Sequence, residues 1–400
     1  MVSDPSAGVM DLTGYADVLE AFRSPALRTL VEPGTGSLRS GTVLRIEGGD
    51  HTRRRRTLNR LTSRDGATWF RDHNLVPIVA AELEGLRQAG AMPVAFDLVE
   101  LGNRLFLRLA WSQIGLSPME SAGELEDVRK LVAELELAYL GTGTPEEREA
   151  MIRRGLAAKD AFGRRYFGPE LAARSNLVAA VSRGERAEAE LPRDLLTLLA
   201  SHADPEWADT ELALREAVTD ILFAGTANSV HSMVHAVNEL FGWLAAHPED
   251  LPLVADPAFL ARAVGEALRV HVINTAFYRL ATEDVVLAGG VRIPAGTTVR
   301  LGIRAANLDP AVFGPDAAAF NPRRQLALGA YPYGLAFGSG VHMCYGLNVV
   351  LGPDQVSGTH PHVLRELFAS GIAPDPDRPP RRPAGSDRDV FESYPVLLKS

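Results

Sequence analysis

The amino-acid sequence predicts a mainly α-helical protein with a small β region, and three observations support this fold class. Helical periodicity of apolar residues recurs along most of the chain, whereas strand-like sequence is concentrated late. No internal repeat or low-complexity linker divides the 400 residues, so we expect a single domain over 1–400. The predicted helices lie at 75–91, 124–140, 145–166, 191–202 and 256–271.

The longest predicted helix covers 209–246. It begins after Asp209 and ends where His-Pro-Glu-Asp follows at 247–250. At the helical rise these residues would extend ~57 Å, which is long enough to cross an entire domain. We therefore expect one continuous helix through this region.

The strands are predicted near the end of the chain. The sequence Val-Val-Leu-Ala-Gly-Gly-Val-Arg-Ile from 285 onward indicates two strands around a glycine-containing turn, and Ile-Pro-Ala-Gly at 293–296 indicates a second turn. A last strand is expected in Tyr-Pro-Val-Leu-Leu-Lys-Ser at 394–400. These short strands form the small β region.

Composition indicates a soluble cytoplasmic protein. Apolar residues make up 46% and charged residues 23%, which is the balance of an ordinary globular protein. A single cysteine excludes an internal disulfide and favours a reducing compartment. The N-terminus lacks the pattern of a secretory signal, and the least charged stretch, 221–238, has the polar content of a buried helix rather than a membrane span. The net charge of −9 argues against nucleic acid as a partner.

The single cysteine lies in an unusual loop. Cys344 follows His342 by two residues, and Gly338, Gly340 and Gly346 surround it. A thiolate acts as a nucleophile or as a metal ligand, and at this spacing the His342 side chain would diverge from the thiol in an extended segment. Glycines let peptide N–H groups point at the sulfur, which stabilises a thiolate that must stay anionic, as an iron ligand must. The alternative is a buried structural cysteine.

Residues 337–346 read Phe-Gly-Ser-Gly-Val-His-Met-Cys-Tyr-Gly. This segment resembles the haem-binding loop of the cytochrome P450 superfamily, Phe-Gly-x-Gly-x-His-x-Cys-x-Gly, at every fixed position. The resemblance, to a soluble bacterial member, implies that Cys344 is the axial iron ligand of a b-type haem. It also implies that Phe337 packs beside the thiolate, that Gly338 belongs to the same haem-binding loop, and that His342 contacts a haem propionate.

Other segments extend the resemblance over nearly the whole chain from about residue 14. Glu266 and Arg269 match the family's Glu-x-x-Arg, and Arg324 fits its Phe-x-Pro-x-Arg segment. The family uses these residues as a structural triad that supports the haem loop. The implied architecture is the cytochrome P450 fold with a shortened N-terminus, because the chain begins almost at the family's B helix.

Positive charge is expected at the two haem carboxylates. Arg279 falls where the family binds a propionate. The sequence His-Thr-Arg-Arg-Arg-Arg at 51–56 resembles another haem-contacting helix of the family, and it places His51 and Arg55 on one helical face. A nucleic-acid patch is the alternative for these arginines, but the acidic total and the lack of interleaved aromatics argue against it.

The oxygen-activating segment departs from the family pattern. Where the family carries Ala-Gly-x-acid-alcohol, this chain has Ala227 at the acid position and Asn228 at the alcohol position. Oxygen activation needs protons, alanine cannot relay one, and an amide is a poor acid. Asn228 remains able to hydrogen-bond dioxygen or order a water, and the Thr226 and Ser229 hydroxyls offer an alternative source of protons.

The segment after the cysteine departs as well. It contains a Gly-Pro break at 352–353 and has no Lys or Arg from 345 through 364, where the family presents basic residues to a ferredoxin. We therefore expect a weak docking face for such a partner. A rival metal site, a zinc pair of His231 and His235, lacks the glutamate of a zinc protease, and these histidines are expected to lie on a helix surface or to pack.

Three functions follow from the resemblance. The first is a monooxygenase that oxidises a small or mid-sized organic molecule in a biosynthetic, secondary-metabolite pathway, with electrons from a ferredoxin and its reductase. The second is a haem enzyme without ordinary oxygen activation, either peroxide-driven or a redox-neutral cyclase, dehydratase or isomerase. The third is a catalytically silent accessory protein. The expected substrate pocket is lined by Asn228 together with Ile221, Phe223, Ala224, Ile273, Asn274 and Thr275.

Overall fold

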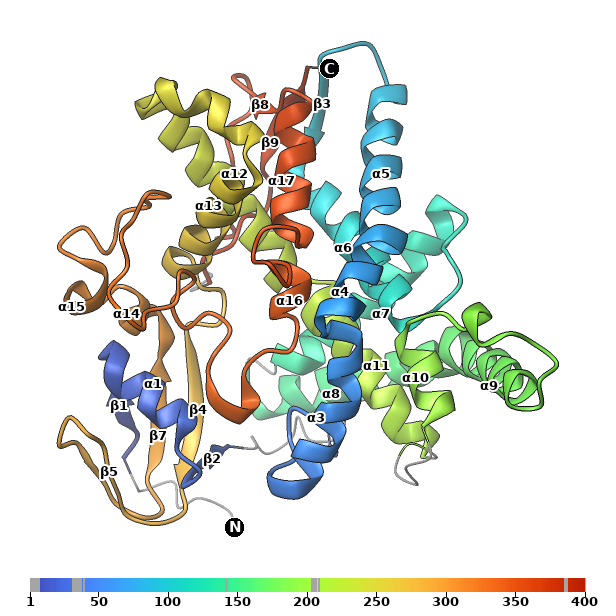
Figure 1. Ribbon diagram of the computed structural model, residues 1–400, viewed down its shortest axis with the longest axis horizontal. Coiled ribbons are helices and arrows are strands. Elements are labelled where there is room, and N and C mark those ends of the chain that lie inside the picture. The colour runs from blue at the N-terminus through green and yellow to red at the C-terminus, as the bar shows by residue number, and fades with distance from the viewer. Residues whose placement is uncertain are drawn as a thin grey trace. The chain divides into compact units, whose positions relative to one another are not determined.

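The computed structural model of the chain describes residues 8–30, 38, 40–140, 143–202, 207, 209–384 and 388–399. Contacts divide the chain into two compact units. Helices predominate in both, and all the strands among the described residues lie in the first (Figure 1). The mainly α fold with a small β region is therefore confirmed. Unit 1 comprises Met1–Leu30, Val79–Gly102 and Val230–Ser400, and unit 2 comprises Val31–Ile78 and Asn103–Ser229.

A four-stranded sheet lies in unit 1 beneath the first helix (Figure 1). Its strand order is β1-β7-β4-β2, with β1 parallel to β7 and the other neighbours antiparallel. Helix α1, Tyr15–Arg23, buries Val18 and Ala21 completely, because apolar residues recur on one of its faces. These residues share a core with Val299 and Leu301 of the sheet. The strands are β1 Met10–Leu12, β2 Leu27–Thr29, β4 Ala276–Ala281 and β7 Thr298–Gly302.

The remaining strands of unit 1 form two smaller sheets. One has the order β3-β9-β8, and the other is a hairpin of β5 and β6 whose turn includes Gly290 at φ 85°. The predicted pair of strands around a glycine turn and the predicted last strand are both confirmed. The bounds are β3 Val94–Asp97, β5 Val285–Val286, β6 Arg292–Ile293, β8 Ala373–Pro374 and β9 Pro395–Leu398.

Helix α13, Pro257–Val270, is the central helix of unit 1 and packs against α17 and α14. It begins where the Asp256 side chain accepts a hydrogen bond from the N–H of Ala258, with Pro257 at its first position. The other helical segments of this unit are η5 Pro248–Ala255, α14 Ile303–Asn307, α15 Pro310–Phe313, η6 Gly340–His342, α16 Leu347–Val350 and α17 Thr359–Ala369.

Every secondary-structure element among the described residues of unit 2 is a helix. Helices α7 and α8 pack closely, and Gly155 permits this approach because a Cβ there would lie 2.3 Å from Cβ of Ala138. Helices α5 Val76–Gln88, α6 Leu98–Ile114 and α12 Ala227–Ala246 contain residues of both units. Those of unit 2 alone are α3 Gly48–Thr62, α4 Arg64–Phe70, η1 Arg71–Leu75, α7 Ala122–Leu140, α8 Pro145–Phe162, η2 Gly163–Phe167, α9 Gly168–Ser182, η3 Glu188–Glu190, α10 Leu195–Ser201 and α11 Thr210–Ala224. All five helices predicted from periodicity are confirmed.

The prediction of one continuous helix over 209–246 is wrong. Helix α11 ends at Ala224 and α12 begins at Ala227. The break begins at Gly225, where an added Cβ would lie 3.0 Å from Cβ of Ala110. Beside it, the Thr226 hydroxyl donates to the carbonyl of Leu222 at 2.7 Å, and such a bond to the residue four positions back bends helices. The interruption therefore falls within the altered oxygen-activating segment.

The expected break after the cysteine loop is confirmed. Helix α16 has only four residues, and α17 begins eight residues after Leu351. Gly352 adopts φ 92°, and a Cβ there would lie 2.6 Å from the N atom of Gly358. Only glycine fits this turn, because other residues would be strained and would collide with the returning chain.

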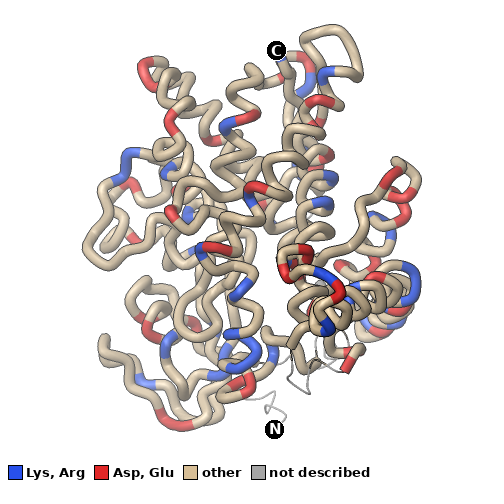
Figure 2. The backbone as a smooth tube through the Cα atoms, turned by 45° about the vertical axis from the view of Figure 1, so that its right-hand side comes forward, with Lys and Arg blue, Asp and Glu red and all other residues tan. Residues whose placement is uncertain are grey.

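Charged side chains are interspersed along the described chain, and Lys and Arg alternate with Asp and Glu on many helices (Figure 2). Among the helices of the described residues, none is both long and apolar enough to cross a membrane.

Candidate haem-binding site

The loop around Cys344 closes on itself in unit 1. The N–H of Cys344 donates to the carbonyl of Phe337 at 2.8 Å, and the N–H of Met343 donates to the carbonyl of Gly340 at 3.1 Å. The Cys344 side chain is exposed, although free cysteine is among the residues most often buried in proteins. A buried structural cysteine, the alternative from the sequence, is therefore excluded.

Two glycines hold this loop against α1. Gly338 has φ 64° and Gly340 has φ 71°, a region that other residues rarely adopt. A Cβ on Gly340 would lie 2.6 Å from the carbonyl oxygen of Phe22. Arg23 donates from Nε to the Ser339 hydroxyl at 3.1 Å, which ties the loop to the same helix.

Phe337 is 9% exposed and packs edge-on against Tyr333, with ring centroids 5.0 Å apart and an interplanar angle of 89°. Burial raises the pKa of Tyr333 to about 12, so this phenol stays neutral. His342 lies in η6 and is partly exposed, two residues before the thiol. The residues predicted for the loop are thus gathered at one place in unit 1.

The predicted triad is assembled in full. Arg269 is completely buried, and its Nε and Nη2 each lie 2.7 Å from a carboxylate oxygen of Glu266. Its Nη1 donates to the carbonyls of Asn307 and Ala317 at 2.6 and 2.7 Å. Nε of Arg324 lies 2.8 Å from Oε1 of Glu266. A bidentate pair with every donor satisfied is the arrangement that a buried ion pair requires.

Asn307 connects this triad to the cysteine loop, and sequence reasoning missed it. Its Nδ2 donates to the carbonyl of Arg269 at 3.0 Å, and its Oδ1 accepts from the N–H of Leu335 at 2.6 Å. Leu335 in turn accepts from the N–H of Gly338. A single asparagine carries no motif, so only the fold reveals this connection.

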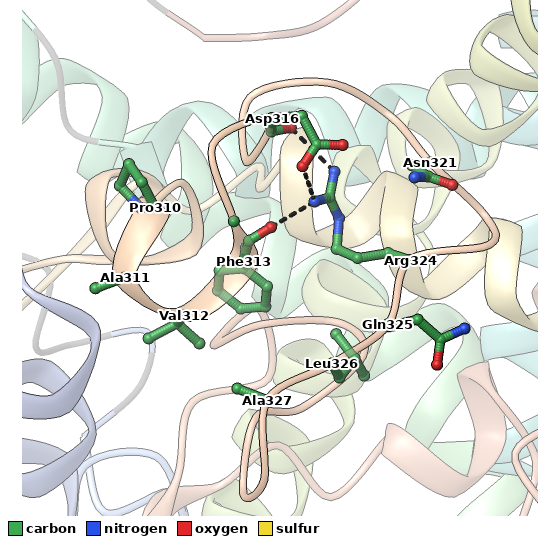
Figure 3. A pocket seen from close by; sticks show the side chains of 11 residues that line it. Pro310, Ala311, Val312, Phe313, Asp316, Asn321, Arg324, Gln325, Leu326 and Ala327 are labelled. Carbon is green, nitrogen blue, oxygen red and sulfur yellow. Dashed lines mark hydrogen bonds and ion pairs between the residues drawn. The ribbon is translucent and has the colours of Figure 1, made fainter.

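Arg324 also lines a surface pocket of about 430 Å³ between α15 and the segment 321–327 (Figure 3). Its guanidinium pairs with Asp316 at 2.7 Å and with the carbonyl of Phe313, as the dashed lines show. The hydrogen bond from Arg324 lowers the pKa of Asp316. The charged groups of this pocket therefore satisfy one another, which gives it a structural role.

The cations predicted for the propionates belong to both units. In unit 1, Arg279 of β4 is 6% exposed and lies over the ring of Phe22, 5.4 Å from its centroid. In unit 2, His51 is 3% exposed on α3, and Nε of Arg55 donates to Oδ1 of Asn59 at 2.8 Å.

Arg54, rather than Arg55, is the buried member of the four arginines. It is 8% exposed, donates to the carbonyl of Gly41 and lies over the ring of Trp207. It therefore helps to hold α3 within unit 2.

The altered oxygen-activating segment spans the break between α11 and α12. Four residues of this segment are partly exposed, namely Phe223, Ala224, Ala227 and Asn228. Two pairs of them lie four positions apart, which is the spacing of residues on one helical face. Among the other predicted residues of α11 and α12, Ile221 is completely buried, and Thr226 and Ser229 are 7% and 9% exposed. In unit 1, Ile273 is 9% exposed, while Asn274 and Thr275 are partly exposed.

Two carboxyl groups on α11, which sequence reasoning missed, lie inside unit 2. Glu216 is 2% exposed and lies two turns before Ala224, and Asp220 is 7% exposed and lies one turn before it. Burial raises the pKa of Glu216 to about 8, although the N–H of Val43 donates to its Oε1 at 2.7 Å, and the nearby Asp220 raises it further. Burial also raises the pKa of Asp220 to about 7. Both groups favour the protonated form in the folded chain.

These raised values predict that the protein loses stability as the pH increases. A carboxyl whose folded-state pKa is raised contributes stability that is fully present below its unfolded pKa and is lost as the pH rises through the folded value. Glu216→Gln keeps an acceptor for Val43 but cannot ionise. Between pH 5.5 and 8.5 we expect the free energy of unfolding to fall by about 2–3 kcal/mol more in the native protein than in this variant, by denaturant titration. The exposed Glu146→Gln serves as the control, and parallel curves for all three proteins would contradict the prediction.

Comparisons with known proteins agree with this geometry. The cytochrome P450 family model matches residues 253–349, a segment that contains Glu266, Arg269, Arg279, Arg324 and Cys344. Nocardicin C N-oxygenase of Nocardia uniformis subsp. tsuyamanensis is 29% identical over 359 residues, which cover 88% of this chain and 78% of that protein. Vitamin D(3) 25-hydroxylase of Pseudonocardia autotrophica is 26% identical over 356 residues, which cover 86% of this chain and 77% of that protein.

The crystal structure of HmtT, a protein involved in himastatin biosynthesis, matches with a TM-score of 0.72 and 20% identity, and covers 100% of this chain and 94% of that one. This likeness shows a shared fold. The matched segment carries both the Glu-x-x-Arg pair and the exposed thiol of the cysteine loop. The family model, the curated relatives and the shared fold together support a member of the cytochrome P450 superfamily, whose enzymes are haem-thiolate oxidoreductases.

Proposed function

We propose that this protein is a monooxygenase that oxidises a small or mid-sized organic molecule in a biosynthetic pathway. The observation that carries the proposal is the exposed thiol of Cys344 in a loop braced by the complete Glu266–Arg269–Arg324 network. Support also comes from an N-oxygenase and a hydroxylase, each similar over more than four-fifths of this chain.

The residues present in the cysteine loop fit a haem. The thiol is accessible, and the glycines at 338 and 340 leave no side chain between the loop and α1. Cys344 would supply the thiolate ligand, while His342 and Arg279 would bind propionate, and the family resemblance adds His51 and Arg55 of unit 2. When bound, the haem supplies dioxygen activation and the transfer of one oxygen atom to substrate.

Residues 226–229 determine how protons would reach the substrate pocket. Ala227 has no proton to give, and the Thr226 hydroxyl donates its proton to the carbonyl of Leu222. Asn228 is partly exposed and offers an amide that can orient a water molecule by hydrogen bonding. We therefore infer that protons come through water, the substrate or the Ser229 hydroxyl in place of a carboxyl–hydroxyl pair.

The proposed pocket is of mixed character. In unit 1, Ile273 is apolar and Asn274 and Thr275 carry hydrogen-bonding groups. In unit 2, Phe223 and Ala224 are apolar and partly exposed, Asn228 carries an amide, and Ile221 lies buried behind them in α11. Such a lining suits an organic molecule with a few polar substituents. Electrons would come from a ferredoxin and its reductase, and the absence of Lys and Arg from 345 through 364 predicts weak docking that depends little on salt.

Turnover under controlled electron supply tests this function. We expect product only with dioxygen and a complete ferredoxin chain, and we expect much of the reductant to be lost as peroxide. The variant Ala227→Glu with Asn228→Thr restores an acid and an alcohol, and it should raise the product formed per reductant, because a positioned acid–base group speeds proton transfer by about 10²–10⁴-fold. Ser182→Thr, on exposed α9, is the control. Product formed anaerobically, without reductant or with peroxide alone, would instead assign the protein to the enzymes that avoid oxygen activation.

A further inference from the structure

A buried cluster of charged side chains joins two distant parts of unit 1. His271 directly follows α13. Its Nδ1 lies 2.7 Å from Oδ2 of Asp389, and its Nε2 lies 2.8 Å from Oε1 of Glu239. Glu239 belongs to α12, and Asp389 precedes β9 by six residues. Because the His271 side chain is only 15% exposed, water screens these contacts little.

The two hydrogen bonds determine the protonation of His271. Ionised carboxylates only accept hydrogen bonds, so both ring nitrogens must carry hydrogen and the ring is an imidazolium. Burial opposes this charge, but the hydrogen bonds to Asp389 and Glu239 outweigh it, and the pKa of His271 lies above its ordinary value. Arg382 also pairs with Asp389, so two positive charges face two negative ones. This balance makes the buried cluster tolerable.

A second histidine, on α12, packs against the bridge that His271 forms between Asp389 and Glu239. The ring of His235 is completely buried and stacks on that of His271, with centroids 4.1 Å apart and 6° between the planes. Its Nε2 donates to the main-chain carbonyl of Asp389 at 2.7 Å, and its Nδ1 has no hydrogen-bond partner among the described residues, as an unprotonated nitrogen can tolerate. Burial and repulsion from His271 lower the pKa of His235 to about 4. Only one ring of the stack is therefore charged at neutral pH.

The cluster links α12 to the C-terminal segment, by which we mean residues 381–384 and 388–398. Phe391 packs on His235 with centroids 5.0 Å apart, and its N–H donates to Nδ1 of His231 at 3.4 Å. The Tyr394 hydroxyl donates to Oδ1 of Asn238 at 3.0 Å. The expectation that His231 and His235 pack is confirmed. The titratable or charged groups around His271 are His231, His235 and Glu239 on α12, and Arg382, Arg388, Asp389 and Tyr394 on the C-terminal segment.

We propose that the doubly protonated His271 is a positioning residue for substrate binding. It links α12 and the C-terminal segment to the connection between α13 and β4. This connection continues from His271 through Ile273, Asn274 and Thr275 into β4. The last three residues belong to the proposed substrate pocket, so this step rests on the proposed function. Loss of the bridge frees the start of that segment and alters the pocket wall.

A metal ion is the alternative occupant of the cluster. Ligand atoms of His235, His271 and Asp389 lie within 4.8 Å of one another. Two imidazoles that bind one ion must direct their lone pairs at it, yet these rings are parallel and stacked. Both nitrogens of His271 are already bonded to carboxylates. The geometry therefore favours a bridge held by protons.

Two measurements on the haem-loaded protein test the proposal. Long-range ¹H–¹⁵N NMR of the ferrous carbonyl form, with His271→Gln for assignment, reports the protonation of the ring. We expect both nitrogens of His271 to be protonated at pH 7, and to titrate at a lower pH in Asp389→Asn and Glu239→Gln, which keep an acceptor but lose the charge. Optical titration with 4-phenylimidazole then reports pocket affinity, which we expect to weaken by about fivefold or more in both variants, the low end of coupling between linked sites.

The pH dependence separates positioning from general stability. A raised histidine pKa contributes stability that is present below the unfolded value and is lost as the pH rises through the folded value. Probe affinity of the native protein should therefore fall above the measured pKa of His271 and stay level in Asp389→Asn. His247→Gln, at an exposed histidine–glutamate pair, is the matched control.

Three outcomes would overturn the proposal. The first is that His271 carries a single ring proton at pH 7. The second is that 4-phenylimidazole affinity is unchanged in Asp389→Asn and Glu239→Gln. The third is that one equivalent of zinc displaces the His271 ring protons in the native protein but not in Asp389→Asn. None of these measurements involves dioxygen or turnover, so failure here is distinct from failure of the proposed monooxygenation.

Discussion

Cys344→Ala is expected to abolish the thiolate signature of the bound haem. The reduced carbonyl complex of the native protein should show the red-shifted Soret band that an electron-donating thiolate produces, and the variant should lack it. The physical reason is that this chain has one cysteine, so no other thiol can replace it. The N–H of Cys344 bonds to Phe337, which keeps the loop closed whatever the side chain at 344 is. The variant should therefore fold.

A second measurement makes this result specific. In the haem-free protein the exposed thiol should react quickly with a maleimide, and haem addition should protect it, as measured by mass spectrometry. Met343→Leu, at the residue beside the thiol, is the control and should retain both the band and the protection. A Cys344→Ala protein that keeps the thiolate band, or a thiol that stays reactive in the loaded protein, would disprove the assignment.

Arg269→Ala is expected to cost about 3–5 kcal/mol of unfolding free energy, a large part of what a typical domain has. The substitution leaves the carboxylate of Glu266 buried beside a single remaining cation, Arg324, and removes the donor that serves the carbonyls of Asn307 and Ala317. Asn307 positions Leu335 before the cysteine loop, so haem retention should fall with stability. Guanidinium titration and haem loss on dialysis measure the two effects.

Arg53→Ala provides the matched control. Arg53 and Asp50 have the same three-residue spacing on a helix, but their side chains are 44% and 65% exposed. Solvent screening limits such a surface pair to about 0–1 kcal/mol. If both substitutions cost the same, the buried network would not be the support of the loop that its geometry indicates.

The local features of the site were predictable from the sequence alone. The glycines at 338 and 340 and the cysteine at 344 lie within one short loop, and Glu266 and Arg269 lie one helical turn apart on α13. Such spacings remain recognisable because backbone geometry determines which neighbouring side chains share a turn or a helical face. The break after the cysteine loop was predictable for the same reason, since a proline lacks the N–H that continues a helix and a preceding glycine favours a turn.

The break in the long helix was decided by tertiary structure. The apolar pattern continues through 209–246, but Gly225 packs against Ala110 of α6, and the Thr226 hydroxyl bonds back to Leu222. Periodicity reports which residues are apolar and carries no information about how closely another helix approaches. For this reason one helix was expected where two exist.

Burial of charge also depended on contacts between distant segments. His271 and Asp389 are separated by 118 positions, and Glu216 accepts from Val43, which lies 173 positions away. A histidine or a glutamate has its ordinary pKa in sequence, and only the partners and the lost water of the folded chain shift that value. The sequence thus determined the fold class, the cysteine loop and the Glu-x-x-Arg pair through local spacing, whereas the helix break, the Asn307 connection and the charged histidine bridge were decided by long-range packing.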